Sequence, residues 1–267
     1  HKQAVPLFDH VIKDPSTAGP ILLELAYTAS NHDDPQLHTP HGLLTVVAGR
    51  ELLRLTRPPG GLGLLRFLVL YTFALHRRAF APSAAAAMAR SVPPAPIEDL
   101  SDAYRKSVRG GLGDQAASVL GRVALDGGFE AAAHLVLQTA LGDIGRLGHN
   151  LVTASCYVDA AAAIGPGRHL VPLLNLARHQ AFSLQGAPAL DVPARKGAGE
   201  GEADAALLGE LVEEGSFDRV EPVLEALAFA GQADEAYRPL LVAVSAEPGF
   251  LGHSLSLVHA ARQASRY

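Results

Sequence analysis

Histidines are the residues of this chain best suited to chemistry. His41, His149 and His253 each stand at the head of a similar apolar stretch, reading H-G-L-L-T, H-N-L-V-T and H-S-L-S-L. His134 precedes His149 by 15 residues, within a segment rich in Ala and Leu. Neutral imidazoles are good ligands for iron, zinc, copper and nickel. The pattern predicts a transition-metal site with these four histidines as ligands.

A fifth candidate ligand is Glu24, which aligns with His134 if the loop before His41 is taken as slightly longer. It lies in the apolar stretch Leu22–Ala26, where a carboxylate is costly unless it is paired, hydrogen-bonded or bound to metal. It would then be a ligand, or an acceptor that orients an imidazole. The alternatives are a solvated helix edge, or an ion pair with one of two arginines, Arg50 or Arg54. A mostly-histidine set without thiolates favours iron first and zinc second.

Two further residues are expected to line a substrate pocket. His38 lies in a polar loop, three residues before His41. Tyr157 follows His149 by eight residues, about two helical turns, and so lies on nearly the same face. The competing interpretations are an exposed loop for His38 and core packing for Tyr157. Each histidine could likewise fill a polar gap between helices, and the sequence assigns no catalytic residue.

The elements that must position these residues are helices. Apolar residues recur at helical spacing, alternating strand-like stretches are hard to find, and Gly/Pro clusters separate the periodic segments. The sequence therefore predicts an all-α fold of repeated antiparallel helix pairs, forming a bundle or a short solenoid-like array. The expected helices span residues 19–31, 41–56, 62–80, 83–91, 98–108, 113–126, 129–142, 149–164, 168–184, 203–214, 218–230, 233–246 and 252–265.

An internal duplication organises these helices. Each histidine-headed stretch follows another apolar helix, and residues 67–80 resemble residues 169–182. We expect one domain over residues 3–267, with copies at about 19–80 and 129–184 and a partial third copy at 218–265. Such repeats bury a shared core between stacked helix pairs. The Gly-, Pro- and charge-rich segment 186–204 is expected to be a mobile loop.

Composition narrows the class of protein. The chain has 267 residues, 48% of them hydrophobic, which excludes disorder as its main state. A net charge of −5 disfavours nucleic-acid binding. The longest apolar run, 62–75, contains Arg66 and is too short to span a bilayer. The lone Cys156 excludes an intrachain disulfide framework and any multi-cysteine metal site. We expect a cytoplasmic protein that acts on a small molecule, binds neither nucleic acid nor membrane, and has an oligomeric state that stays open.

The histidine-headed stretches resemble the questin oxidase-like family. The motifs are H-G-L-L-T from His41, G-H-N-L-V-T-A from Gly148 and G-H-S-L-S-L-V-H-A-A from Gly252. The resemblance implies an all-helical oxygenase of aromatic polyketides that holds its metal mainly with histidines. Only His41, His149 and His253 match the family's motif. The chain lacks Trp, and its few lysines lie outside apolar helices, which argues against a carboxylated-lysine ligand.

Two functions follow from these observations. The first is a metal-dependent oxidoreductase or oxygenase, with non-haem iron as the expected metal, acting on an aromatic or polyketide-like small molecule in a helical core. The second is a helical-repeat protein-interaction module without catalysis, whose stacked helices present a partner surface. A small-molecule-binding domain without turnover is a third option. The first predicts metal bound by His149 and its equivalents, whereas the second predicts none.

Overall fold

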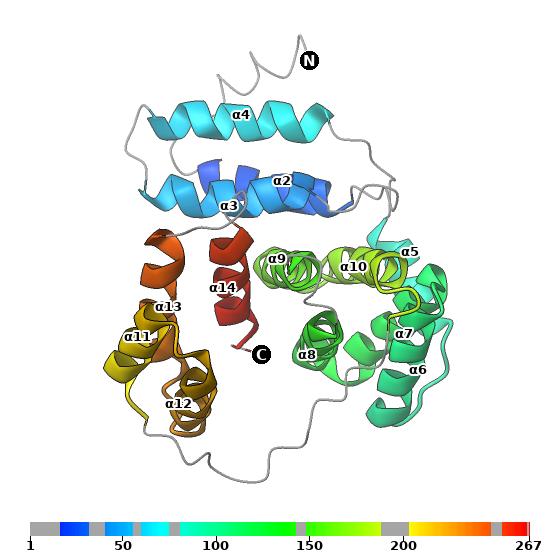
Figure 1. Ribbon diagram of the computed structural model, residues 1–267. Helices are drawn as coiled ribbons and strands as arrows, with labels where there is room; N and C mark the ends of the chain where they lie inside the picture. Colours follow the sequence, from blue (N-terminus) through cyan, green and yellow to red (C-terminus); the bar gives the residue numbers. More distant parts are fainter. Residues whose placement is uncertain are drawn as a thin grey trace. The chain divides into compact units, whose positions relative to one another are not determined.

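A computed structural model of the chain describes residues 17–31, 41–55, 60–74, 81–142, 148–187, 203–246, 253–265 and 267. In these ranges the chain forms α-helices and no strand (Figure 1). The all-α prediction is confirmed. The helices are α2 (Ala18–Ser30), α3 (His41–Leu55), α4 (Gly60–Ala74), α5 (Pro82–Arg90), α6 (Ile97–Arg109), α7 (Gly113–Asp126), α8 (Gly128–Leu141), α9 (His149–Ile164), α10 (Leu170–Ser183), α11 (Ala205–Glu214), α12 (Phe217–Phe229), α13 (Ala233–Ala246) and α14 (His253–Ala264).

Local signals explain where the helices begin and end. The side chain of Asp204 accepts hydrogen bonds from the backbone N–H groups of Ala206 and Leu207, which caps the start of α11. The same helix ends at Gly215, whose φ of 71° is a conformation that favours glycine. Pro82 opens α5, where its missing N–H costs nothing.

The chain divides into two compact units that are interleaved in sequence. Unit 1 comprises residues 1–142 and 153–188, and unit 2 comprises residues 143–152 and 189–267. The expected duplication and the single-domain assignment stay predictions. Most of the expected mobile loop at 186–204 lies outside the described residues.

In unit 1, α7 and α10 are the centre of the packing. Helix α7 contacts α5, α6 and α10, while α2, α3 and α4 pack against one another. Gly121 on α7 permits a close approach to α5, because a Cβ placed there would lie 2.7 Å from Ala89 Cβ. A buried chain of hydrogen bonds also links three helices: the Tyr104 hydroxyl of α6 donates to Gln180 of α10, whose amide donates to the Val136 carbonyl of α8 at 2.8 Å.

Unit 2 has a smaller core of its own. Helices α11, α12 and α13 pack together, and α14 packs against α13. The buried core residues are Leu208, Leu211, Val223, Leu227 and Ala236. Among the described residues of both units, no helix combines the length and the apolar character that a membrane span requires.

Candidate functional site

The three motif histidines occupy equivalent places in the fold. His41 is the first residue of α3, His149 of α9 and His253 of α14. The sequence prediction that each lies in the first turn of a helix is confirmed. Each of these helices also follows the helix predicted to precede it, namely α2, α8 and α13.

Within unit 2, the start of α9 lies against α14. Gly148, directly before His149, has a φ of +71°, and a Cβ placed on it would lie 2.6 Å from Leu257 Cδ1. Any larger residue here would clash with Leu257 as well as strain the backbone. His253 begins α14 four residues before Leu257, or about 6 Å along the helix axis. The contact therefore brings the starts of two histidine-headed helices near each other.

A buried hydroxyl lies one turn beyond His149 on α9. Thr153 is fully buried, and its Oγ1 has no hydrogen-bond partner among the residues that the structure describes. Residues four apart share a helix face, so Thr153 lies on the same face as His149. Buried polar atoms almost always have a partner, so this hydroxyl has room for a hydrogen bond to water or to a group outside the described residues.

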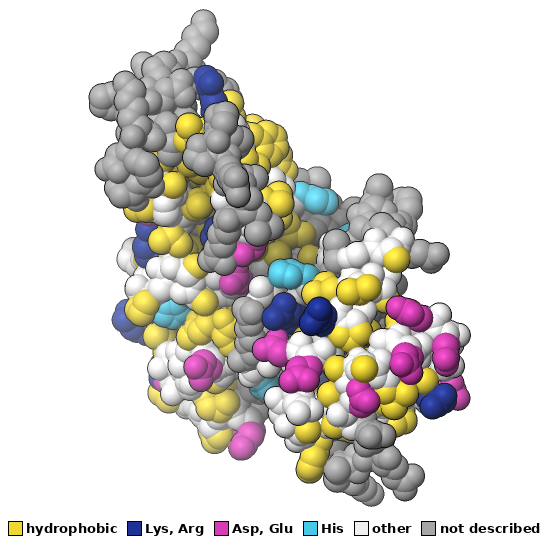
Figure 2. Space-filling view, turned by 90° about the vertical axis from the view of Figure 1, so that its left-hand side faces the viewer, with side chains coloured by type: hydrophobic (Ala, Val, Ile, Leu, Met, Phe, Trp, Pro, Cys, Tyr) yellow, Lys and Arg dark blue, Asp and Glu magenta, His cyan; other side chains and the backbone are white. Residues whose placement is uncertain are grey.

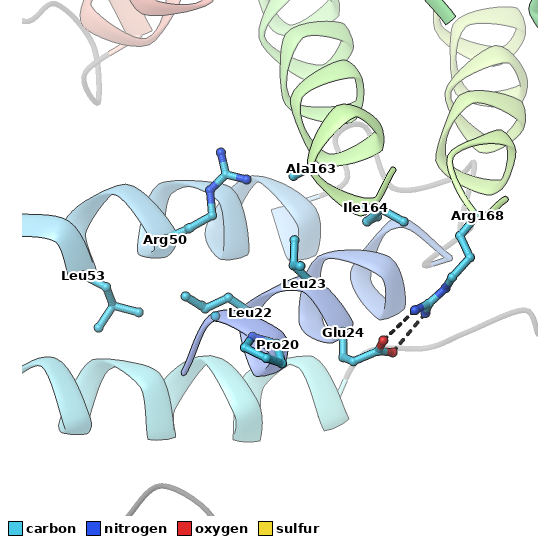
Figure 3. Close-up of a pocket in the computed structure, with 10 residues that line it drawn as sticks. Pro20, Leu22, Leu23, Glu24, Arg50, Leu53, Ala163, Ile164 and Arg168 are labelled. Atoms are coloured by element: carbon cyan, nitrogen blue, oxygen red, sulfur yellow. Dashed lines mark hydrogen bonds and ion pairs between the residues drawn. The ribbon is translucent and has the colours of Figure 1, made fainter. Parts of the chain in front are cut away.

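Glu24 lies on an exposed edge of α2 and pairs with Arg168. Two hydrogen bonds join its carboxylate to the guanidinium group, at 2.5 and 3.0 Å (Figure 3). The same guanidinium lies 3.8 Å from the centre of the Tyr27 ring. The hydrogen bonds from Arg168 lower the pKa of Glu24. The carboxylate is thus compensated by an arginine, the kind of partner that the sequence allowed for, although Arg168 itself was not foreseen.

The remaining predicted site residues lie on several helices or outside the described residues. His41 and His134 are exposed, on α3 and α8 of unit 1. Tyr157 is only 1% exposed and packs in the core. His38 and the side chain of His253 lie outside the described residues. No group of three or more potential metal ligands occurs among the side chains that the structure describes. The five-ligand site therefore stays a prediction.

Cys156, on α9, is not a reactive group. Burial raises the pKa of its thiol to about 12, and the nearby carboxylate of Asp159 adds to this effect. The thiolate is the form that attacks electrophiles and binds metal. At neutral pH this cysteine is therefore a protonated, unreactive thiol.

Unit 1 contains an open pocket between α2, α3 and the end of α9. Its volume is about 720 Å³, and most of its lining is apolar, from side chains such as Leu22, Leu53 and Ile164 (Figure 3). Arg50 and Arg168 supply its positive charges. An apolar cavity with a few polar groups at its rim is typical of small-molecule sites.

The arginines of this pocket are already neutralised. Arg50 donates to Asp159 at 2.6 Å and to Glu51 at 3.3 Å, while Arg168 pairs with Glu24. The two guanidinium groups and their three carboxylate partners together carry a net charge of −1. The pocket, which we call the unit 1 pocket, therefore favours an uncharged apolar ligand whose oxygens accept hydrogen bonds from the unused guanidinium N–H groups.

Sequence reasoning did not foresee the two arginines of the unit 1 pocket. Arg50, with its neighbour Glu51, interrupts the apolar stretch of residues 43–53, and it was considered only as a partner of Glu24. Arg168 follows a Gly-Pro-Gly turn and carries no local signal of its role.

The chain was also compared with known proteins. It matches no family model, no curated protein and no solved structure.

Proposed function

We propose that this chain is a metal-dependent oxidoreductase that binds an apolar, aromatic small molecule, with His149 and His253 among its metal ligands. The observation that carries the proposal is the close approach of Leu257 to Gly148, since Gly148 directly precedes His149 and Leu257 lies about one helical turn after His253. The donor chemistry also fits, since imidazole suits iron and zinc.

The same positions carry the resemblance to the questin oxidase-like family. A bound iron would supply the redox chemistry, which side chains alone do not provide. The residues of the chain would orient the metal and the substrate and would keep water away. Glu24 and His134 contribute less to this proposal than the sequence suggested, because one is paired with Arg168 and both are exposed.

Metal content is the direct test. We expect the full chain, purified without a tag or chelator, to retain near-stoichiometric iron or zinc, measured by inductively coupled plasma mass spectrometry. The variants His149→Ala and His253→Ala should each lose most of it and take up less added Fe(II) or Zn(II) in calorimetric titrations. Both readouts are independent of enzymatic turnover.

His259→Ala is the matched control. His259 is an exposed histidine on α14, six residues after His253 and so on another side of the helix. It should keep wild-type metal content. Folded wild-type protein that neither carries nor takes up metal would refute the proposal. Equal losses in all three variants would point to non-specific binding by histidines.

The unit 1 pocket supports a second candidate function: binding of a neutral apolar molecule without turnover. We expect an uncharged fluorescent probe such as Nile red to bind unit 1. Leu23→Gln, which places an amide on the pocket wall, should weaken that binding several-fold. Leu52→Gln changes an exposed leucine of α3 outside the pocket lining and should not. Probe affinity that is the same in both variants would argue against this site.

The interaction-module alternative has its own structural support. Helix α4 exposes Leu62, Phe67 and Phe73, with exposed fractions of about half for each. Exposed apolar patches mark interaction surfaces. In Figure 2, basic side chains on the visible described surface stand in small groups among acidic and apolar ones. A metal-free, folded protein would favour this alternative, with the exposed apolar side chains of α4 as the candidate surface.

A further inference from the structure

Unit 2 contains a groove that is separate from the proposed metal site and from the unit 1 pocket. It lies between α13 and α14 and has a volume of about 570 Å³. Its lining residues are Asp234, Arg238, Leu241, Val242, Ser245 and Arg262. We call it the α13–α14 groove.

Arginines that are only partly neutralised dominate this groove. Arg262 donates through Nε to Asp234 at 3.2 Å, but Asp234 is 74% exposed, and such exposed pairs are weak. Arg238 makes no hydrogen bond or ion pair with any other residue that the structure describes. Two guanidinium groups and one carboxylate give the groove a net charge of +1, in a chain whose net charge is −5.

The other lining residues of the groove offer a ligand apolar surface and no free hydrogen-bond donor. Leu241 and Val242 supply aliphatic surface, and Val242 is 60% exposed. The hydroxyl of Ser245 donates to the Leu241 carbonyl of its own helix at 2.6 Å, which uses its only proton. Donors for an incoming ligand therefore come from Arg238 and Arg262, beside an apolar wall.

We infer that the α13–α14 groove binds a small carboxylate with an apolar tail. The planar guanidinium groups match the two oxygens of a carboxylate, and charge-assisted hydrogen bonds of this kind are among the strongest in proteins. The aliphatic tail covers Leu241 and Val242. The unit 1 pocket differs in charge, because its two arginines are paired with three carboxylates of the chain, whereas Arg238 has no ion-pair partner among the described residues.

Octanoate is the probe for this inference. We expect it to bind the full-length chain with one-to-one stoichiometry in isothermal titration calorimetry, and to bind at least about tenfold more tightly than 1-octanol. Arg238→Gln should weaken octanoate binding about tenfold, and Arg262→Gln should weaken it by less, because Asp234 already occupies part of that guanidinium. Raised salt should weaken binding of octanoate but not of 1-octanol.

Arg219→Gln is the matched control, because Arg219 is an exposed arginine of α12 that does not line the groove. It should bind octanoate like the wild type. Absence of octanoate binding, equal binding of 1-octanol or acetate, or an unchanged affinity in Arg238→Gln would each overturn the inference. The metal-binding variants separate the two proposals: His149→Ala should lose metal and keep octanoate, whereas Arg238→Gln should keep metal.

Discussion

At the scale of single residues, His179 shows how burial sets a pH response. It lies on α10 and is nearly inaccessible, and burial lowers its pKa to about 4. The unfolded chain holds this histidine at its ordinary pKa of about 6.5. Between these two values the unfolded state binds a proton that the folded state rejects, so the free energy of unfolding falls as the pH drops through this window.

We therefore predict that His179→Leu removes part of the acid sensitivity of unit 1. In the wild type, lowering the pH from 7 to 5 should cost about 2 kcal/mol through this residue alone. Urea unfolding at the two pH values measures this cost, and the variant should lack it. His134→Gln, which changes an exposed histidine of α8, should keep the wild-type difference. An identical pH response in His179→Leu would show that other groups control acid stability.

At the scale of helices, local patterns predicted the elements well but not their partners. All the helices expected from periodicity and Gly/Pro punctuation are present, with their described ends displaced by a few residues, and the expected end of the helix over 62–80 lies outside the described residues. Apolar periodicity depends only on residues within one segment, so the sequence of that segment is enough to predict a helix. The pairs Glu24–Arg168 and Arg50–Asp159 join residues more than one hundred positions apart. No local pattern specifies such pairs.

The residues of the candidate sites show the same contrast between features that local sequence predicts and features that depend on packing. The sequence placed His41, His149 and His253 at helix starts because capping and breaker residues are local signals. It could not place Arg238 and Arg262 in one groove, because that depends on how α13 packs on α14. Glu24 in an apolar stretch correctly indicated a compensated carboxylate, but the compensating group is an arginine from a distant turn.

Helix packing predicts the effect of adding one methyl group to α7. Gly121→Ala would place Cβ 2.7 Å from Ala89 Cβ and 3.3 Å from Leu174 Cδ1, so α5 must shift. We expect this overpacking to lower the free energy of unfolding by about 1–3 kcal/mol, measured by urea denaturation.

Gly63→Ala is the control for this substitution. Gly63 is also helical, on α4, and nothing lies within 4 Å of the added Cβ. That change should stabilise the chain by roughly 0.5–1 kcal/mol, because alanine is the better helix former. If both substitutions change stability in the same direction, α5 and α7 do not need the glycine for their close approach.

At the scale of the whole molecule, the proposed metal site predicts a link between metal binding and folding. A ligand that binds only the folded state raises its stability by about 2.7 kcal/mol at one hundred times its dissociation constant. We predict that Zn(II) at that excess raises the urea midpoint of the wild-type chain. His149→Ala and His253→Ala should show no such rise, and His259→Ala should show the wild-type rise. A midpoint that Zn(II) leaves unchanged in the wild type would contradict a site built by the folded chain.

The interleaving of the two units has a consequence for how the protein is made. Gly148 and Leu257 are about 110 residues apart in the chain, and both belong to unit 2, while every segment of unit 1 ends by residue 188. At ordinary rates of translation, about 5–20 s pass between the synthesis of these two residues. Unit 1 is completely synthesised during that interval, whereas Gly148 meets Leu257 only after α14 has left the ribosome. A nascent chain paused before α14 would therefore contain every residue of unit 1 while Gly148 still lacks its contact with Leu257.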